Sequence, residues 1–316
     1  MAFTVANNEH LIRSNLWSRD LKRLLEDELM AMRFVRMITD FPDGTTINIP
    51  SIGQAEVLDY DEGQAVRYTA MDTGNFTFTI TQYKQSAAYI SEKMKQDSFY
   101  AQDVVASFVP RQHRAIMVAI ETRILNRPTA GQTTSNLNTI NGGDHRFVGS
   151  GTSETISPKD FQRARFALHK ANVPLNNLVA IVDPSVEYAL ATSTNLVNVS
   201  NNKSWEGIVR DGMSTGTRFL FNIYGFDVYV SNYLESGLAE TIGGLTTTTG
   251  KANLFFSATP GDTLPFVGLI RQPPKVESEF NKDLQREEYV TTCRYDFKLY
   301  RPENMVVVIT DDDQVS

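Results

Sequence analysis

The stretch from Thr46 to Ile80 alternates apolar and polar residues at both ends, but it has few large apolar side chains in its middle. Alternation of this kind is typical of β-strands, and Asp61-Glu62-Gly63 is a turn signal between the two arms. An isolated hairpin is only marginally stable in water, so we expect this two-armed excursion to pack against another chain. The apolar residues that define its arms are Ile47, Ile49, Val57, Val66, Tyr68, Phe76, Phe78 and Ile80.

Composition places the chain among ordinary globular proteins and argues against a surface built for nucleic acid. Its 316 residues are 41% hydrophobic and 21% charged, with a formal net charge of -7. Tight binding of nucleic acid needs clustered Lys and Arg. The single cysteine, Cys293, excludes an internal disulfide and a thiolate zinc site, and its alternating context predicts a buried structural thiol.

The sequence predicts no targeting segment and no membrane contact. The first residues lack the basic and apolar regions of a signal peptide. No run reaches the roughly 18 apolar residues of a membrane span. We therefore expect synthesis in a bacterial or host cytoplasm.

Hydrophobic periodicity predicts helices on both sides of the excursion. Residues 17–38 have a helical period, and residues 97–128 form a longer helical pattern. Pro110 lies within the second pattern, so we expect a break or kink before it and an uninterrupted helix after it. Residues 129–155, rich in Gly, Ser, Thr and Asn, are predicted to be a mobile loop. Ser157 is the expected N-cap of a further helix.

The rest of the chain alternates strand and helix signals. Residues 179–182 read as a buried strand that turns into a helix, and residues 217–234 as two strands around a turn. Residues 253–258 and 266–270 are predicted short strands. Residues 289–310 are predicted to be two long strands of one sheet. The simplest interpretation of the acidic tail that follows is a solvated terminus.

No catalytic constellation is evident. Residues 212–216 match G-x-S-x-G around Ser214, but a nucleophile elbow requires a strand before the motif and a helix after it, and the context favours neither. The histidines are far apart in the sequence, and phosphate-binding glycine motifs are missing, so we predict neither a metal nor a cofactor. The histidines are His10, His113, His145 and His169, of which His145 falls in the predicted mobile loop.

Two features of the sequence are candidates for contacts between subunits. The carboxylates of the excursion have Arg67 nearby, which indicates either an ion pair between subunits or a solvated turn. Trp17 precedes an amphipathic helix, where it serves either as an anchor in a neighbouring groove or as an intramolecular staple. The candidate interface residues are Trp17, Asp59, Asp61, Glu62, Arg67 and Tyr68.

The order of these elements resembles the major capsid proteins of tailed bacteriophages, whose fold is shared with herpesvirus shells and encapsulins. Residues 44–80 are similar to the family's E-loop and residues 97–126 to its spine helix. The resemblance implies an α+β fold. Its parts would be an N-terminal arm (1–40), an E-loop (41–88), a peripheral domain (89–155 and 255–316) and an axial domain (156–254). Residues 178–190, 223–234 and 285–309 also carry the likeness.

The resemblance further implies a shell of pentamers and hexamers that encloses double-stranded DNA without sequence-specific binding. Each arm of the excursion has about twenty residues and reaches about 60 Å, enough to cross onto an adjacent subunit. The resemblance implies either a separate scaffolding protein or a chain already in its mature form. A portal protein and a cement or decoration protein would be further partners, and the virion its location, after synthesis in the host bacterial cytoplasm. Some members link subunits through a Lys–Asn isopeptide bond. That bond is predicted absent, since no lysine lies between Lys22 and Lys84.

Two other functions remain open from the sequence. An encapsulin-like compartment would use the same fold to enclose an enzyme cargo rather than DNA. A serine hydrolase built on Ser214 is the more distant alternative, and it alone would make the chain an enzyme.

Overall fold

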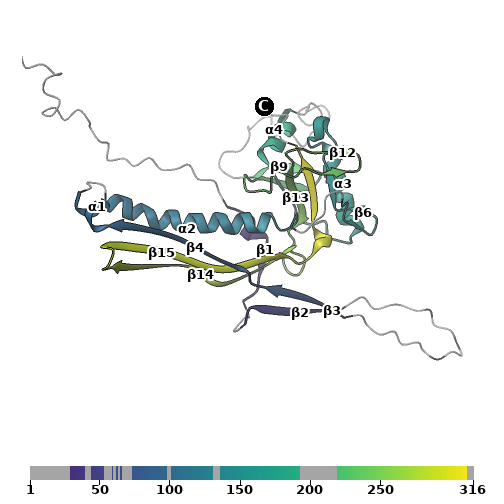
Figure 1. The fold of residues 1–316 in the computed structure, drawn as a ribbon. Coiled ribbons are helices and arrows are strands. Elements are labelled where there is room, and N and C mark those ends of the chain that lie inside the picture. Colours follow the sequence, from purple (N-terminus) through teal and green to yellow (C-terminus); the bar gives the residue numbers. More distant parts are fainter. Residues whose placement is uncertain are drawn as a thin grey trace, which may run out of the picture.

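A computed structural model shows an elongated layer, a more compact unit at one end of it, and a hairpin that projects from the region where they meet (Figure 1). The structure describes residues 29–39, 44–52, 59, 62, 65, 73–97, 101–130, 136–192 and 219–311. Helices and strands occur in both parts, so the predicted α+β class is confirmed.

The elongated layer is a four-stranded sheet with the order β1-β14-β15-β4, covered on one face by the long helix α2 (Figure 1). Strand β1 runs parallel to β14, and the other neighbours are antiparallel. The elements of this layer are the short 3-10 helix η2 (Ala31–Phe34), β1 (Val35–Met37), β4 (Gln82–Ser91), α1 (Glu92–Asp97), α2 (Ala101–Leu125), β14 (Phe266–Asn281) and β15 (Arg286–Leu299).

The compact unit is a six-stranded sheet with the order β7-β16-β13-β8-β10-β9. All five residues of β8 are buried, because alternate residues pack into two different cores on the two faces of the sheet. Near-continuous apolar strands are expected of a sheet covered on both faces. The elements are β7 (Arg146–Val148), α3 (Pro158–Lys170), β8 (Leu178–Val182), α4 (Pro184–Thr192), β9 (Phe219–Ile223), β10 (Phe226–Val230), β13 (Lys251–Ser257), the 3-10 helix η5 (Pro302–Asn304) and β16 (Val306–Thr310).

Local sequence signals fix the start of α3 as predicted. The Ser157 side chain accepts a hydrogen bond from the Lys159 N–H, and the Asp160 carboxylate accepts one from the Ser157 N–H at 2.8 Å. This reciprocal capping satisfies backbone donors that the first helical turn leaves without partners. Helix α3 then packs Phe161 and Leu168 into the core of the compact unit.

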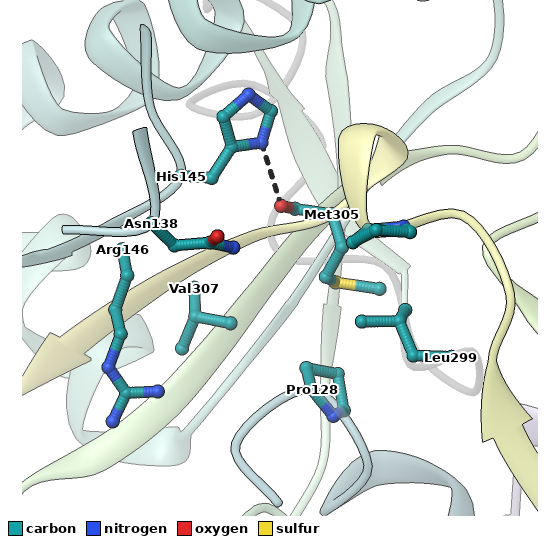
Figure 2. Close-up of a pocket in the computed structure, with 8 residues that line it drawn as sticks. Pro128, Asn138, His145, Arg146, Leu299, Met305 and Val307 are labelled. Carbon is teal, nitrogen blue, oxygen red and sulfur yellow. Dashed lines mark hydrogen bonds between the residues drawn. The ribbon is translucent and has the colours of Figure 1, made fainter. Parts of the chain in front are cut away.

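The expectation of a mobile loop over residues 129–155 is wrong for the second half of that stretch. It holds β5 (Thr139–Ile140), β6 (Gly143–Asp144), β7 and the 3-10 helix η3 (Thr152–Glu154). His145 is 1% exposed, and its Nδ1 lies 3.0 Å from the Met305 carbonyl oxygen (Figure 2). Because β7 pairs with the C-terminal strand β16, a partner distant in sequence orders what local composition marks as loop.

Helix α2 passes through Pro110 without ending, so a break there is wrong, whereas the uninterrupted helix predicted after it is confirmed. A kink at Pro110 stays a prediction. The Pro110 side chain is exposed, so its ring adds no bulk to the core. The sheet-facing side of α2 buries Ile116, Ile120 and Ile124. Packing along that face, rather than local propensity, holds the helix together across the proline.

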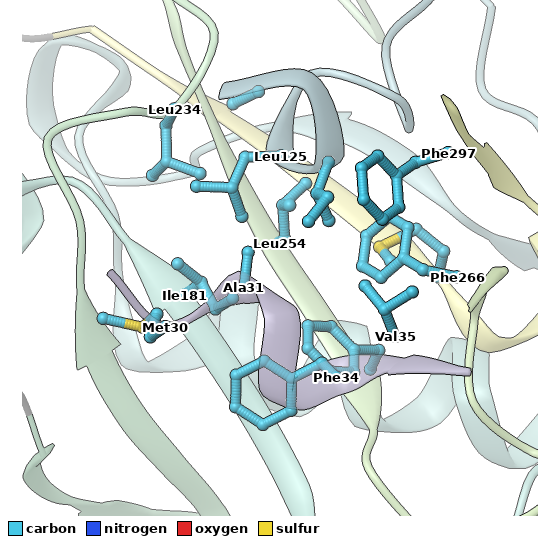
Figure 3. Close-up of a cluster of buried hydrophobic side chains, with 14 of the residues drawn as sticks. Met30, Ala31, Phe34, Val35, Leu125, Ile181, Leu234, Leu254, Phe266 and Phe297 are labelled. Carbon is cyan, nitrogen blue, oxygen red and sulfur yellow. The ribbon is translucent and has the colours of Figure 1, made fainter. Parts of the chain in front are cut away.

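The predicted helix over residues 17–38 is wrong at its C-terminal end, and residues 17–28 lie outside the described part of the chain. Residues 31–34 form η2 and residues 35–37 form strand β1. Met30, Ala31, Phe34 and Val35 are buried among side chains of α2 and both sheets (Figure 3). The buried Glu121 of α2 accepts backbone hydrogen bonds from Met30 at 2.9 Å and from Ala31. Tertiary contacts therefore override the helical pattern here.

Three predictions for the C-terminal third need correction. Residues 266–270 begin β14, which has 16 residues, and are not a separate short strand. The two strands predicted within residues 289–310 exist as β15 and β16, but they belong to different sheets. Asp311 is buried rather than solvated, since its carboxylate accepts hydrogen bonds from the N–H and the hydroxyl of Thr248. The predicted strands at residues 179–182 and on either side of Tyr224-Gly225 are confirmed as β8, β9 and β10.

Candidate assembly surface

The excursion predicted from the sequence begins as a hairpin. Strand β2 (Thr46–Ile52) pairs antiparallel with β3 (Thr73–Thr79), in a register that runs from Thr46–Thr79 to Ile52–Thr73. In Figure 1 the pair extends away from the layer and from the compact unit. A two-stranded ribbon of this kind presents much backbone and side-chain surface for its size, which suits it for contact with another chain.

The root of the hairpin is seated on the layer by a small apolar cluster. Phe78, Ile80 and Leu269 are buried, and Ile38, Ile47 and Phe76 pack against them half-buried. Leu269 comes from β14, so the cluster joins the hairpin to the sheet. The alternation of residues 76, 78 and 80 predicted a strand, but it carried no sign of which surface that strand would cover.

Polar and aromatic contacts add to the seating. The Lys298 Nζ donates a hydrogen bond of 2.9 Å to the Thr77 carbonyl oxygen. The rings of Phe76 and Tyr300 meet edge to face with 5.0 Å between their centroids, and the Ile80 N–H donates to the Thr45 carbonyl oxygen at 2.9 Å. Edge-to-face pairs contribute beyond the area that they bury. The root therefore has a defined position on the layer.

Of the predicted interface residues, the structure describes Asp59 and Glu62. Asp59 and Glu62 are exposed. Trp17, Asp61, Arg67 and Tyr68 lie outside the described residues. The ion pair between subunits and the anchoring role of Trp17 therefore stay predictions.

Sequence reasoning missed a second surface, the free edge of β4. Strand β4 pairs only with β15, and no other described strand covers its second edge. Tyr83 and Tyr89 of β4 are each 62% exposed. Large exposed aromatic side chains are enriched at protein interfaces. Beside the hairpin root, a hollow of about 390 Å³ is lined by Ile80, Thr81, Gln82, Tyr83, Gln272 and Arg294.

The opposite edge of the layer has features that discourage strand pairing. Beyond its contact with β1, strand β14 carries Pro273 and Pro274, and its register with β15 shifts on both sides of Gln272. Prolines, register irregularities and charged side chains protect edge strands from pairing with other chains. Because β4 has no proline, it is the better candidate for contact with a neighbour. A run of alternating residues without a proline or a bulge is the sequence signal that could have identified it.

A buried charged cluster includes Arg146, which Figure 2 shows beside Asn138, Val307 and Pro128. Arg146 donates hydrogen bonds to both carboxylate oxygens of Glu240, and these side chains are 2% and 6% exposed. Desolvation raises the pKa of Glu235, against the opposing charge of Arg146. Desolvation likewise lowers the pKa of His145. A carbonyl oxygen can only accept a hydrogen bond. The neutral His145 therefore carries its proton on Nδ1, and this N–H donates a hydrogen bond to the Met305 carbonyl oxygen.

The sequence features considered for catalysis gain no support. Residues 212–216, with Ser214, lie outside the described part of the chain, and the next described element is strand β9 rather than a helix. Among the described residues no group of three or more His, Cys, Asp or Glu side chains could hold a metal ion. His113 and His169 are exposed on their helices, and His10 is not among the described residues. Cys293 is fully buried, as predicted.

No helix in the described ranges is both long and apolar enough to span a membrane.

The sequence profile of the family described as phage capsid protein matches residues 75–308. The chain belongs to this family. A comparison with curated protein sequences finds no match.

Solved capsid structures share the fold at low sequence identity. The capsid of cyanophage P-SCSP1u is 15% identical, with a TM-score of 0.72, covering 98% of this chain and 95% of that one. A chain of Mycobacterium phage Che8 is 18% identical with a TM-score of 0.67, covering 93% and 96%. The capsid of cyanophage Pam1 is 12% identical with a TM-score of 0.69, covering 95% and 97%.

Family and fold together confirm the resemblance to tailed-phage major capsid proteins. The assignment of the layer with α2 to a peripheral domain with its spine helix, and of the hairpin to an E-loop, stays a prediction. The chain is a shell protein of the virion, and its location there is confirmed. The exact limits of the arm, the E-loop and the two domains stay predictions.

Proposed function

We propose that many copies of this chain assemble as pentamers and hexamers into an icosahedral shell around double-stranded DNA. The observation that carries the proposal is the hairpin, which projects from the body on a defined root. A projecting segment with its own anchored base can hold a neighbouring subunit at a set direction. Repeated over many copies, modest contacts of this kind give a strong closed particle.

We propose that the excursion packs on the peripheral domain of a neighbouring subunit. The exposed tyrosines of β4 and the unprotected β4 edge support a contact on this layer. Asp59 and Glu62, both exposed on the excursion, are available for an ion pair between subunits, which is one of the two roles that the sequence leaves open. The role of the chain is geometric, and none of its described residues is assigned a chemical step.

The charge of the chain fits a wall that faces DNA without binding it tightly. A formal net charge of -7 disfavours the neutralisation of phosphates by Lys and Arg on which sequence-independent affinity depends. DNA inside the shell would therefore be confined rather than held by the wall.

The remaining partners are a separate scaffolding protein, a portal protein and a cement or decoration protein. An isopeptide link through the excursion is excluded by its lack of lysine between Lys22 and Lys84. Shell strength would then come from noncovalent contacts or from the cement protein. Intact particles are expected to run as single chains on denaturing gels, whereas a covalent ladder would contradict this.

The test is negative-stain electron microscopy of the full chain, expressed alone and together with the genes beside its own. Closed shells, or hexamers and pentamers, are the expected result. A uniform monomer or dimer under every condition would overturn the proposal. Particles isolated from an infection distinguish the encapsulin-like alternative, since a protein cargo in place of DNA would favour a nanocompartment.

A further inference from the structure

The carboxylate of Asp296, in β15, lies beside the C-terminal part of α2 and beside Thr81, where the hairpin leaves the layer. Tyr295 pairs with Gln82 and is the last residue of β15 that pairs with β4. Asp296 comes directly after it. Thr81, just before Gln82, is the residue through which the hairpin leaves the layer. Asp296 is 2% exposed, so its charge must be satisfied by the protein around it.

The two oxygens of this carboxylate bond to different elements. Oδ2 accepts hydrogen bonds from the Thr81 N–H at 3.0 Å and from the Thr81 hydroxyl at 2.7 Å. Oδ1 accepts from Arg123 Nη2 at 3.2 Å and from Arg123 Nε at 3.3 Å, and Arg127 Nη2 lies 3.5 Å away. Oδ1 also accepts from the Phe297 N–H at 2.8 Å. One oxygen thus holds the hairpin, and the other holds the end of α2 and the backbone of β15.

Direct contact between helix and hairpin completes the arrangement. Arg123 Nη2 also lies within 3.4 Å of the Thr81 hydroxyl oxygen. The apolar cluster of Phe78, Ile80 and Leu269 fixes the hairpin to the sheet but includes no residue of α2. The cluster therefore relates the hairpin to α2 only through the sheet, whereas the polar contacts around Asp296 link Thr81 directly to Arg123 of α2. Charge-assisted hydrogen bonds are both stronger and more directional than neutral ones.

We infer that Asp296 is a positioning residue that fixes the direction of the hairpin relative to helix α2. Because it joins the two through separate oxygens, any tilt of α2 against the sheet is passed on to the hairpin. The direction of the hairpin decides where a neighbouring copy is contacted. Asp296 would therefore couple the shape of one subunit to the placement of the next.

Asp296→Asn separates these roles without changing side-chain size. An amide offers one oxygen, so it can accept from Thr81 or from the arginines, while its NH₂ faces donors on the other side. Thr81→Val is a milder variant, because it removes the hydroxyl group and leaves the Thr81 N–H. Thr81→Ser keeps a hydroxyl group at this position. Asp262→Asn is the matched control, since Asp262 pairs with Arg36 at an exposed site.

The measurement is the distance between spin labels on the unassembled full-length chain. Cysteines replace Asn75 on β3 and Ala115 on α2, both of which are exposed. A second pair at Ala115 and Lys282 reports on the layer alone. Cys293 can remain, because it is buried and desolvation raises its pKa to about 11, which leaves it unreactive toward labels.

Wild type, Thr81→Ser and Asp262→Asn are expected to give one narrow distance for the Asn75 pair. Asp296→Asn and Thr81→Val should lose that single peak, while the Lys282 pair stays unchanged. An unaltered Asn75 distance in both variants would overturn the inference. So would equal broadening of both label pairs, because it would mean that the whole subunit loosens. If Asp296→Asn does not fold, Thr81→Val decides alone. The test needs no shells, so failure of the proposed function would be seen separately.

Discussion

Replacement of Phe78 by alanine tests whether the hairpin root is held by its apolar cluster. Phe78 is fully buried, and its neighbours Ile80 and Leu269 are buried too. Phe→Ala in a protein core costs about 3–5 kcal/mol. We expect about 3 kcal/mol here, the lower end, because Ile47 and Phe76 are only half-buried and can move into the space left behind.

The loss should fall on the attachment of the hairpin rather than on the whole fold. The cluster is separate from the two main cores, so it can open while they stay closed. A loss of about 3 kcal/mol raises the population of the open root about 100-fold. Hydrogen exchange by the backbone amides of β2 and β3 should accelerate by this factor. Exchange in the central strand β8 should not change.

Phe166→Ala is the matched control, since Phe166 is 53% exposed on α3 and its truncation should leave exchange in the hairpin unaltered. Unchanged protection of β2 and β3 in Phe78→Ala would refute the reasoning. So would a uniform acceleration across β2, β3 and β8, since the root would then unfold only together with the cores.

Three further predictions concern the buried groups. Arg146→Met should lower the free energy of unfolding by about 3–5 kcal/mol, because it leaves the charge of Glu240 buried without its partner. Stability should fall as pH drops below the ordinary histidine pKa of 6.5. Burial lowers the pKa of His145 in the folded chain, so the unfolded chain binds more protons in this range. His145→Asn should weaken this dependence of stability on pH. Native Cys293, with its pKa raised from 9.0 to about 11, should have about 100-fold less thiolate at pH 8 and resist alkylation until unfolded.

Each has its own check. Denaturant unfolding compares the free energy of unfolding of Arg146→Met with that of Lys275→Met, which loses an exposed ion pair with Glu277. Equal losses of stability in the two variants would contradict the role of burial. Unfolding at a series of pH values compares wild type with His145→Asn, and parallel curves between pH 5 and about 6.5 would remove His145 as the cause. Mass spectrometry follows alkylation of Cys293, and rapid native modification would show that the thiol is accessible.

The fold was predictable where the signal is local. The cap at Ser157, the turn at Tyr224-Gly225 and the alternation in β2 and β3 each require only neighbouring residues, and each is present in the structure. The helix predicted through residue 38 failed because its last residues pair with β14, more than 200 positions away. The break at Pro110 failed because tertiary packing outweighs the local cost of a proline at an exposed position.

The candidate site was predictable in outline only. Poor core content identified the excursion as a contact segment, but the sequence could not show that Thr81, Arg123 and Asp296 meet. Those residues come from three elements, and no periodicity relates them. The exposed β4 edge was missed for a similar reason, since exposure depends on which strands lie beside it.

In both sheets, strands from early in the sequence pair with strands from late in the sequence, and this has a consequence for when the chain can fold during synthesis. Strand β16, at residues 306–310, lies between β7 and β13, and β14 lies between β1 and β15. Neither sheet can close until the ribosome has made β15, which ends at Leu299, and β16, which ends at Thr310. Growing chains therefore expose unpaired strands throughout translation, a stage at which aggregation competes with folding. A product that stops before β15 lacks one strand of each sheet and cannot reach the described fold.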